Sequence, residues 1–272
     1  MPTQPKMMKQ TLNPSLSAIA FLAASLLPLA AAEPDADQLL RDMSTKLAAT
    51  KSFSFEATRE IDGALLEAQK APEKARVAVS VQRPDQIVVR AEGDLGVRRF
   101  IADGTTLTLF DEKMNHYTTL PMKTNLDGLV DQLEQKYGFM PPLAEFALSD
   151  PYKEFRSQAH TVSYLGLAKT PGGFLGLGGV ECHRLALNGK EADAELWIAV
   201  GDQLPRKLTA TFHRAGQPQV RITFSKWNLA APVNAAQFTF APPKGALQIE
   251  MWTPAKMQAH RARAKQPAKH KS

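Results

Sequence analysis

Apolar and polar residues alternate one by one through a long series of short segments in this chain. The first segment shows the pattern, because Phe53, Phe55 and Ala57 are interleaved with Ser54 and Glu56. Successive side chains of a β-strand point to opposite faces, so each segment predicts a strand with one apolar and one polar face. Strands are expected over residues 53–61, 75–81, 87–91, 97–102, 105–111, 115–121, 160–167, 180–187, 194–200, 205–213, 219–227 and, as a short final segment, 237–240.

Two other stretches follow the helical period. Leu40, Met43 and Leu47 recur at spacings of three and four, which predicts an amphipathic helix over about residues 35–50. Between two runs of strands, residues 126–137 repeat their apolar side chains on one helical face, and residues 141–148 are expected to form a shorter helix. No composition break or internal repeat divides the 272 residues, so we expect a single folded domain.

A single antiparallel sheet of this width is expected to curl, because the twist between neighbouring strands accumulates. Its apolar face then becomes concave and needs a cover, since exposed apolar area costs about 25 cal/mol per Å2. We therefore predict a mainly β (α+β) fold, in which one curled antiparallel sheet forms an unclosed half-barrel. The N-terminal helix and the mid-chain helix cover it, the latter as a lid. Such a shape suits an apolar ligand.

The candidate ligand site is defined by these two patterns. The residues expected to face a ligand are Phe53, Phe55, Val77, Val79, Ile87, Val89, Leu107, Leu109 and Phe212. The residues expected to form the lid are Leu126, Leu129, Val130 and Leu133. The alternative at each position is a side chain that simply fills the core.

The first 32 residues have the pattern of a secretory signal. Lys6 and Lys9 precede an uncharged apolar run, and Ala30-Ala31-Ala32 supplies the small residues of a cleavage site. We expect cleavage after Ala32, with residues 33–252 as the folded domain. A retained membrane anchor is the alternative, although about 15 apolar residues fall short of the ~20 needed to span a bilayer. One cysteine, and hence no internal disulfide, is compatible with export to a bacterial periplasm.

The positive charge of the chain is concentrated at its C-terminus. The formal net charge is +6, and residues 253–272 hold six Lys or Arg and no acidic residue. We predict a basic, disordered tail that is either simply solvated or in weak contact with an anionic surface. Without this tail and the two N-terminal lysines, the body carries −2, which disfavours binding to nucleic acid.

The residue types that carry catalysis or bind metals show no recognisable spacing. The histidines at 116, 160, 183 and 213 are scattered over separate predicted strands, without an HxxxH or HExxH motif. Cys182 and His183 are adjacent in a strand, so their side chains point to opposite faces and cannot form a nucleophile–base pair with each other. We therefore predict that the protein is not an enzyme and has no metal and no cofactor.

The glycine-rich stretch at residues 172–179 superficially suggests a phosphate-binding loop. A phosphate cradle needs a helix N-terminus behind it, whereas this stretch leads into the predicted strand at 180–187. Two interpretations remain: a flexible hairpin connection, or an apolar flap at the cavity mouth formed by Phe174, Leu175 and Leu177.

Seven short motifs lie in a fixed order between Asp35 and about Met251. They are Arg83-Pro84-Asp85, Asp103-Gly104 with Leu107-Thr108-Leu109, Ser149-Asp150-Pro151-Tyr152, Leu196-Trp197-Ile198, Leu204-Pro205-Arg206-Lys207-Leu208, Trp227-Asn228-Leu229, and Phe238-Thr239-Phe240 before Pro242-Pro243. With this order and spacing the chain resembles a family of uncharacterised predicted periplasmic proteins within the lipoprotein-carrier superfamily of LolA, LolB and RseB. The resemblance implies an unclosed antiparallel barrel with a helical lid that binds acyl chains in its cavity.

These observations favour a non-catalytic periplasmic carrier whose ligand is the acyl chain of a lipid or lipoprotein. The chain lacks the lipobox cysteine of the outer-membrane receptor type, which favours a soluble carrier or sensor. Two alternatives stay open. One is an envelope-stress sensor that uses the same cavity to regulate a membrane or envelope protein partner, and the other is a structural interaction module with a filled core.

Overall fold

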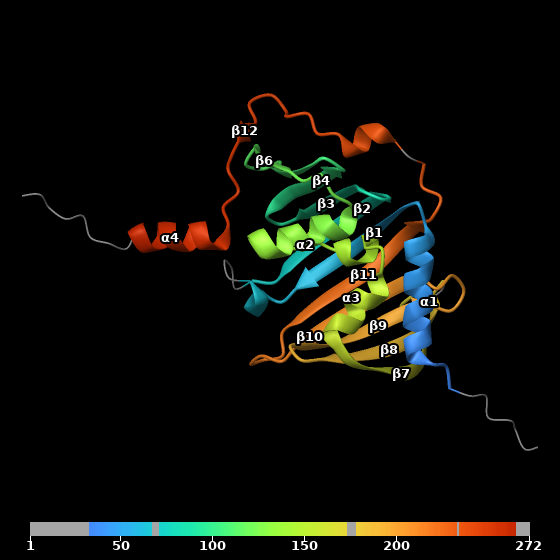
Figure 1. The fold of residues 1–272 in the computed structure, drawn as a ribbon. Coiled ribbons are helices and arrows are strands. Elements are labelled where there is room, and N and C mark those ends of the chain that lie inside the picture. Colours follow the sequence, from blue (N-terminus) through green and yellow to red (C-terminus); the bar gives the residue numbers. More distant parts are fainter. Residues whose placement is uncertain (1–32, 67–70, 173–177, 233, 265–272) are drawn as a thin grey trace, which may run out of the picture. The chain divides into compact units, whose positions relative to one another are not determined.

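The structure, a computed structural model, describes residues 33–66, 71–172, 178–232 and 234–264, with side chains as far as residue 260. The proposed signal and the proposed flap at 174–177 lie outside the described residues. Twelve strands form one sheet, in the order β12-β6-β5-β4-β3-β2-β1-β11-β10-β9-β8-β7 (Figure 1). They are β1 (Ser52–Ile61), β2 (Glu73–Gln82), β3 (Gln86–Gly93), β4 (Gly96–Asp103), β5 (Thr106–Asp111), β6 (His116–Pro121), β7 (Ala159–Lys169), β8 (Glu181–Gly189), β9 (Ala192–Ala199), β10 (Pro205–Phe212), β11 (Gln219–Asn228) and β12 (Leu247–Gln248).

All pairings in this sheet are antiparallel except that of β12 with β6. Strands β1–β6 form one meander and β7–β11 form a second. The two meanders join where β1 pairs with β11, with Ala57 opposite Phe224 and Arg59 opposite Ile222. The predicted mainly β class and its open, mostly antiparallel sheet are therefore confirmed.

Four helices accompany the sheet: α1 (Ala36–Ala49), α2 (Leu126–Tyr137), α3 (Pro151–Gln158) and α4 (Pro254–Ala264). The first begins where the Asp35 carboxylate accepts hydrogen bonds from the main-chain N–H groups of Asp37 and Gln38, at 2.9 and 3.2 Å. The second begins where Asn125 accepts from the N–H of the residue three positions on, and it ends at a left-handed Gly138. Both helices were predicted from the sequence.

Two short predicted elements differ in the structure. Residues 141–148 do not form an α-helix, because only the 3-10 turn η2 (Ala144–Ala147) occurs there and α3 follows it. Asp150 caps α3 by accepting a 3.0 Å hydrogen bond from the N–H of Lys153, with Pro151 at the first helical position. Residues 237–240 are not a strand either. Asn234 accepts from the N–H of Ala236 and starts the 3-10 turn η4 (Ala235–Phe238).

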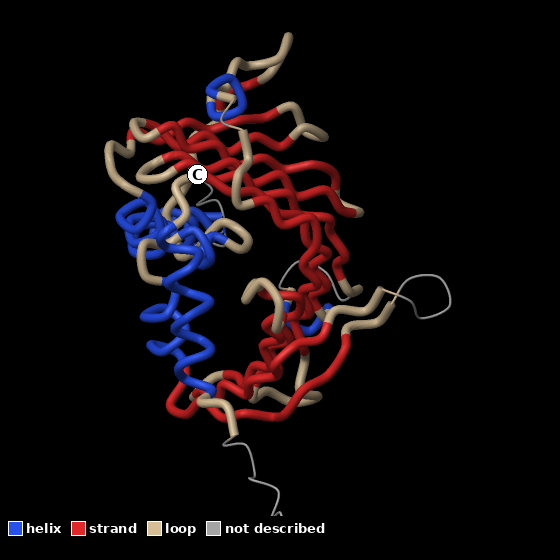
Figure 2. Tube along the Cα trace, turned by 90° about the vertical axis from the view of Figure 1, so that its right-hand side faces the viewer, coloured by secondary structure: helices blue, strands red, loops and turns tan. Residues whose placement is uncertain are grey.

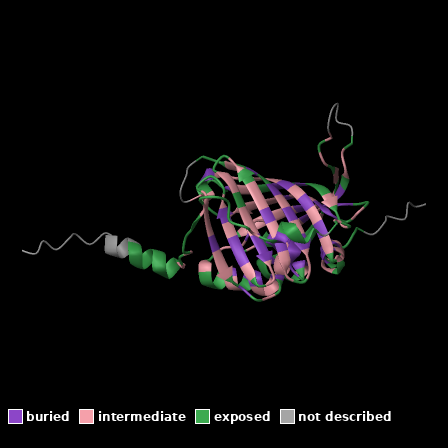
Figure 3. Ribbon diagram, turned by 90° about the horizontal axis from the view of Figure 1, so that it is seen from above, coloured by how far each residue is buried: buried purple, intermediate pink, exposed green. Residues whose placement is uncertain are grey.

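The helices α1, α2 and α3 lie on one side of the sheet (Figures 1 and 2), and their apolar faces join the apolar face of the strands in one buried core. Buried and more exposed residues alternate along the strands (Figure 3), as the sequence pattern predicts. At the centre, the Phe146 ring of η2 lies 6.3 Å from Phe55, 5.6 Å from Phe155 and 5.0 Å from Phe224. The side chain of Phe146 thus connects η2 and α3 to the two strands at the centre of the sheet.

Arg83, in the turn between β2 and β3, ties the helices to the sheet. Its Nη1 donates to the main-chain oxygen of Ala147 at 2.6 Å, and its Nη2 donates to Leu148 and Leu47 at 3.0 and 3.3 Å. Its Nε donates to the oxygen of Thr50 at 3.2 Å. These carbonyls belong to the C-terminal ends of α1 and η2, where main-chain oxygens run out of helical partners, and the Leu47 oxygen accepts from the Thr50 N–H as well, at 3.2 Å. The Arg83 guanidinium therefore donates hydrogen bonds to main-chain carbonyls at the ends of two elements, α1 and η2.

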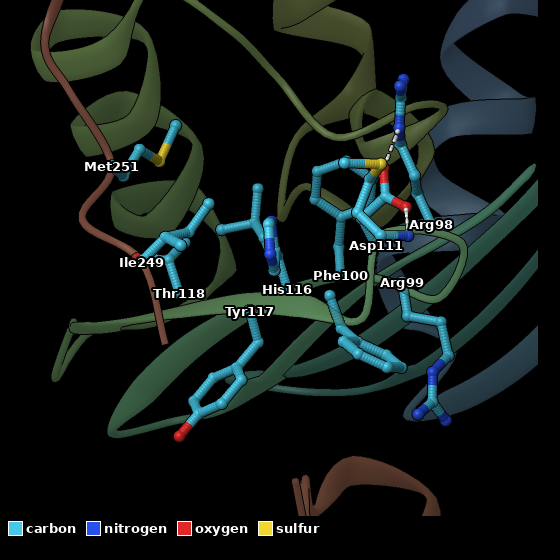
Figure 4. Close-up of a pocket in the computed structure, with 12 residues that line it drawn as sticks. Arg98, Arg99, Phe100, Asp111, His116, Tyr117, Thr118, Ile249 and Met251 are labelled. Carbon is cyan, nitrogen blue, oxygen red and sulfur yellow. Dashed lines mark hydrogen bonds and ion pairs between the residues drawn. The ribbon is translucent and has the colours of Figure 1, made fainter. Parts of the chain in front are cut away.

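The C-terminal segment passes around the β6 edge of the sheet. On the face away from the helices, the Phe240 ring lies 5.3 Å from Phe110 and 5.2 Å from Tyr117. The chain then pairs with β6, where Leu247 N–H donates to Asn115 O at 3.0 Å and Ile249 N–H donates to Tyr117 O at 2.7 Å. Beyond β12 it continues on the helix side of the sheet (Figure 4).

Residues 254–264 of the basic tail form helix α4. Thr253 accepts a 3.2 Å hydrogen bond from the N–H of Lys256, and the Trp252 ring lies 4.8 Å from His260. These local contacts start and support the helix. Among the described residues, we find no helix with the length and apolarity required to cross a bilayer.

Candidate functional site

The residues predicted to face a ligand are mostly buried in the core. Seven of them are buried: Phe53, Phe55, Val77, Val79, Ile87, Val89 and Leu107. The four predicted lid residues, Leu126, Leu129, Val130 and Leu133, are buried in the same cluster. Leu109 packs against this cluster but is only partly buried, and so is Phe212. The predicted lid residues of α2 and most of the predicted ligand-facing residues thus lie together in one buried cluster.

A cavity of about 290 Å3 lies beside this core, over β4, β5 and β6. Its lining residues are Arg98, Arg99, Phe100, Leu109, Phe110, Asp111, Met114, His116, Tyr117, Thr118, Ile249 and Met251. In Figure 4, Phe100, Thr118, Ile249 and Met251 lie on the helix side of the strands, whereas Tyr117 and Arg99 point away from it. We call this cavity the helix-side pocket. Its position at the sheet edge means that the C-terminal segment forms part of its wall.

Strand register arranges the floor of the helix-side pocket in two rows. Phe100, Leu109 and Thr118 are direct neighbours on β4, β5 and β6, and they make a row that is apolar except for the Thr118 hydroxyl; we call it the apolar row. The Phe100 ring also contacts the ring of Phe139, at 6.2 Å between centroids, beyond the end of α2. The apolar row is therefore bounded by aromatic side chains towards the core.

The second row is polar. Arg98, Asp111 and His116 pair across the same three strands, and Arg98 Nε lies 3.3 Å from Asp111 Oδ2. The other Asp111 oxygen accepts a 2.9 Å hydrogen bond from the N–H of Met114. The helix-side pocket thus has an apolar length and one charged end, which is the distribution of polarity found in an amphiphile.

A second cavity of about 300 Å3 lies on the opposite face, between the strands and the C-terminal segment. Its lining is largely polar and includes Asp103, Thr106, Thr108 and Thr119, with the hydroxyls of Thr108 and Thr119 3.0 Å apart. Burial raises the pKa of the Asp103 carboxyl, but four hydrogen bonds from neighbouring threonines outweigh burial and leave the pKa below its usual value. These oxygens already have partners within the chain.

A third cavity, of about 190 Å3, contains the ion pair of Arg59 with Glu73, at 3.0 Å. Nearby, burial raises the pKa of the Glu145 carboxyl to about 7; hydrogen bonding to its own main chain and the Arg59 charge oppose this rise, whereas Glu154 adds to it. Throughout the part of the chain that the structure describes, no three His, Cys, Asp or Glu side chains are grouped so that they could hold a metal ion.

The remaining reactive groups are separate. Cys182 is buried, and burial raises its pKa to about 11. His183 lies 3.0 Å from the Tyr164 hydroxyl, and His213 lies 3.0 Å from Asp193 on the surface.

Sequence reasoning identified only Leu109 among the residues that line the helix-side pocket. Phe100 lies in the predicted strand at 97–102, but Phe100 and Ile101 are both apolar, so alternation did not show which of them faces the helices. Ile249 and Met251 carried no signal, because their place beside β6 depends on the path of the C-terminal segment around the sheet edge.

The chain was compared with known families and proteins. A family model described as "Predicted periplasmic protein (DUF2092)" matches residues 36–252, which confirms the family resemblance indicated by the motifs. The comparison with curated proteins found no match.

Solved structures to which this chain is similar come from several bacteria. One is an uncharacterised conserved protein from Thermus thermophilus, with 13% identity and a TM-score of 0.45, over 79% of this chain and 99% of that chain. Another belongs to the Pseudomonas aeruginosa MucA/MucB complex, with 17% identity and a TM-score of 0.42, over 76% of this chain and 62% of that one. A third is the LolA superfamily protein NE2245 from Nitrosomonas europaea, with 12% identity and a TM-score of 0.36, over 76% and 99%.

Proposed function

The chain belongs to the DUF2092 family of predicted periplasmic proteins, and we propose that it is a non-catalytic carrier that shields an acyl chain of a lipid or lipoprotein. The observation that carries the proposal is the helix-side pocket, whose apolar row of Phe100, Leu109 and Thr118 ends at a charged row. We also propose that the sheet is curled, as its width predicts, and that its concave face is the one that carries the helices and surrounds the ligand.

The size of the pocket limits what it binds. Small-molecule sites usually measure about 300–1,000 Å3, so a cavity of about 290 Å3 suits one short apolar chain better than a whole lipid. The acyl chain lies along the apolar row, and its polar head points towards Arg98 and His116. An anionic head group then faces the Arg98 guanidinium, which is half-exposed and shares its charge with Asp111.

The proposed cover differs from the lid expected from the sequence. Helix α2 keeps its four apolar side chains packed in the core, whereas Ile249 and Met251 contact the pocket from a segment that is attached to the sheet edge through the two-residue strand β12. Ligand entry therefore displaces the C-terminal segment. Of the predicted ligand-facing residues, Leu109 lines this pocket.

A filling substitution tests this proposal. Thr118→Phe places a ring in the helix-side pocket, and Thr223→Phe, on the outer face of β11, is the matched control. Binding of the fluorescent fatty acid cis-parinaric acid is measured by titration. We expect saturable binding by the wild-type protein and the control, and at least tenfold weaker binding by Thr118→Phe.

Two outcomes would contradict the carrier. One is the absence of saturable probe binding by the wild-type protein, together with no lipid in its native mass spectrum. The other is equal binding by the two variants when both unfold at the wild-type temperature. Retention of a stable envelope protein in a pull-down, without any bound lipid, would instead support the sensor alternative.

A further inference from the structure

The C-terminal segment exposes several large apolar side chains close to the helix-side pocket. Leu247 is 61% exposed, Ile249 48%, Met257 40% and Trp252 36%. Met114, which lines the pocket from the β5–β6 turn, is 59% exposed. Five of the nine exposed large apolar residues of the described chain thus lie in the C-terminal segment or in the turn that lines the pocket beside it.

The same segment carries the positive charge of the protein. Residues 253–272 hold six Lys or Arg and no acidic residue, and they begin directly after Trp252. Lys256 forms an ion pair with Glu250 and lies over the Trp252 ring, with Nζ 5.5 Å from its centroid. The tail thus keeps a large net charge next to an amphipathic aromatic ring.

We propose that the C-terminal segment, residues 247–272, docks the protein on an anionic lipid bilayer. Trp252 and its apolar neighbours lie in the interfacial layer, and the basic residues contact the lipid head groups. Apolar area combined with Lys and Arg is what interfacial binding requires, and tryptophan prefers the head-group level. This inference rests on the proposed function, because Ile249 both lines the pocket and faces solvent, so a docked membrane lies at the pocket mouth.

The chemistry of the segment favours a bilayer over nucleic acid. Binding to the phosphates of a nucleic acid would use only the Lys and Arg side chains. The exposed Leu247, Ile249 and Trp252 side chains are removed from water only when they enter an apolar phase such as a bilayer. The rest of the folded body is slightly negative, so it offers a nucleic acid no further attraction.

The test measures vesicle binding by the full-length protein. Sedimentation is compared for vesicles of phosphatidylcholine alone and vesicles with about 30% phosphatidylglycerol. One variant removes four tail cations: Arg261→Gln, Arg263→Gln, Lys265→Gln and Lys269→Gln. The matched control removes four cations from the sheet: Lys74→Gln, Arg76→Gln, Arg90→Gln and Lys226→Gln.

We expect binding that needs the anionic lipid and weakens with salt, a loss of at least tenfold in the tail variant, and little change in the control. Trp252→Ala should weaken binding as well, and it should abolish the blue shift of tryptophan emission on vesicle addition. Equal binding to both vesicle types, an equal loss in the control, or tighter binding to duplex DNA than to vesicles overturns the inference. Titration with cis-parinaric acid in the absence of vesicles tests the carrier proposal separately from the docking proposal. If only the docking proposal fails, the wild-type protein and the tail variant both still bind this probe.

Discussion

Arg83 Nη1 donates a 2.6 Å hydrogen bond to the main-chain oxygen of Ala147, which joins the β2–β3 turn to the end of η2. Burial lowers the pKa of the Arg83 guanidinium below its ordinary value, because the charge is partly removed from water. A buried cation is acceptable only when it is well hydrogen-bonded, and four carbonyls provide those bonds. This residue is thus the polar centre of the contact between the helices and the sheet.

Arg83→Ala should lower the free energy of unfolding by about 3 kcal/mol, because the carbonyl ends of α1 and η2 lose their donors. Arg83→Lys should recover little, since an ammonium group cannot reproduce the planar fork. Urea unfolding followed by circular dichroism measures both. Arg90→Ala, at an exposed ion pair with Glu92, is the control and should cost less than about 1 kcal/mol. Similar losses for Arg83→Ala and Arg90→Ala would refute the assigned role.

Phe146→Ala should cost about 3–5 kcal/mol, because the ring is fully buried among three other aromatic rings and its removal leaves a cavity. Thermal and urea unfolding both report the change. Leu165→Ala, on the exposed edge strand β7, should stay within about 0.5 kcal/mol. A cost below about 1 kcal/mol at Phe146 would mean that η2 is not part of the cooperative core.

The stability of the protein should fall as the pH rises through neutrality. The pKa of Glu145 is about 7 in the folded protein against 4.5 ordinarily, so the folded state holds this proton more tightly than the unfolded chain. Raising the pH from 4.5 to above 7 therefore removes stability, by roughly 2–3 kcal/mol. Glu145→Gln should abolish this part of the pH dependence, whereas the exposed Glu181→Gln should keep it. Parallel wild-type and Glu145→Gln stability curves would contradict the assignment.

Cys182 should resist thiol reagents in the native protein. Its side chain is buried, and a pKa of about 11 in place of 9 reduces the reactive thiolate roughly 100-fold at pH 8. Iodoacetamide labelling followed by mass spectrometry should show modification only after unfolding. A cysteine introduced at the exposed Ser163 of β7, in a Cys182→Ser background, should react within minutes. Rapid native labelling of Cys182 would show that its surroundings open.

The sequence pattern identified the secondary structure best where local physics decides it. Strict alternation marked β1 and β2, and helical spacing marked α1 and α2. Helix α3 was missed because it is short and mostly polar, and its apolar face consists of few side chains: Pro151 is buried, and Tyr152 and Phe155 are partly buried against the core. The two-residue β12 has no pattern of its own, and it becomes a strand only by pairing with His116 and Tyr117.

The location of open space could not be predicted from alternation. A two-residue period tells which face a side chain occupies, but not whether a helix fills the volume above it. Leu107 and Leu109 belong to the same face of β5, yet the first is buried in the core and the second borders the helix-side pocket. The difference arises from where α2 ends and where the C-terminal segment crosses, and both depend on the assembled fold.

The pairing of β1 with β11 has a consequence for assembly of the chain. Glu56 and Ser225 are 169 residues apart in sequence but adjacent in the sheet. When the N-terminus emerges first, β1–β6 can pair while the second neighbour of β1 is still missing, which leaves an open strand edge. Contacts between residues so distant in sequence form late, so β1 and β11, in the middle of the sheet, are expected to pair last. The partly synthesised chain, with β1–β6 paired and β11 still missing, therefore needs a chaperone more than the complete folded protein does.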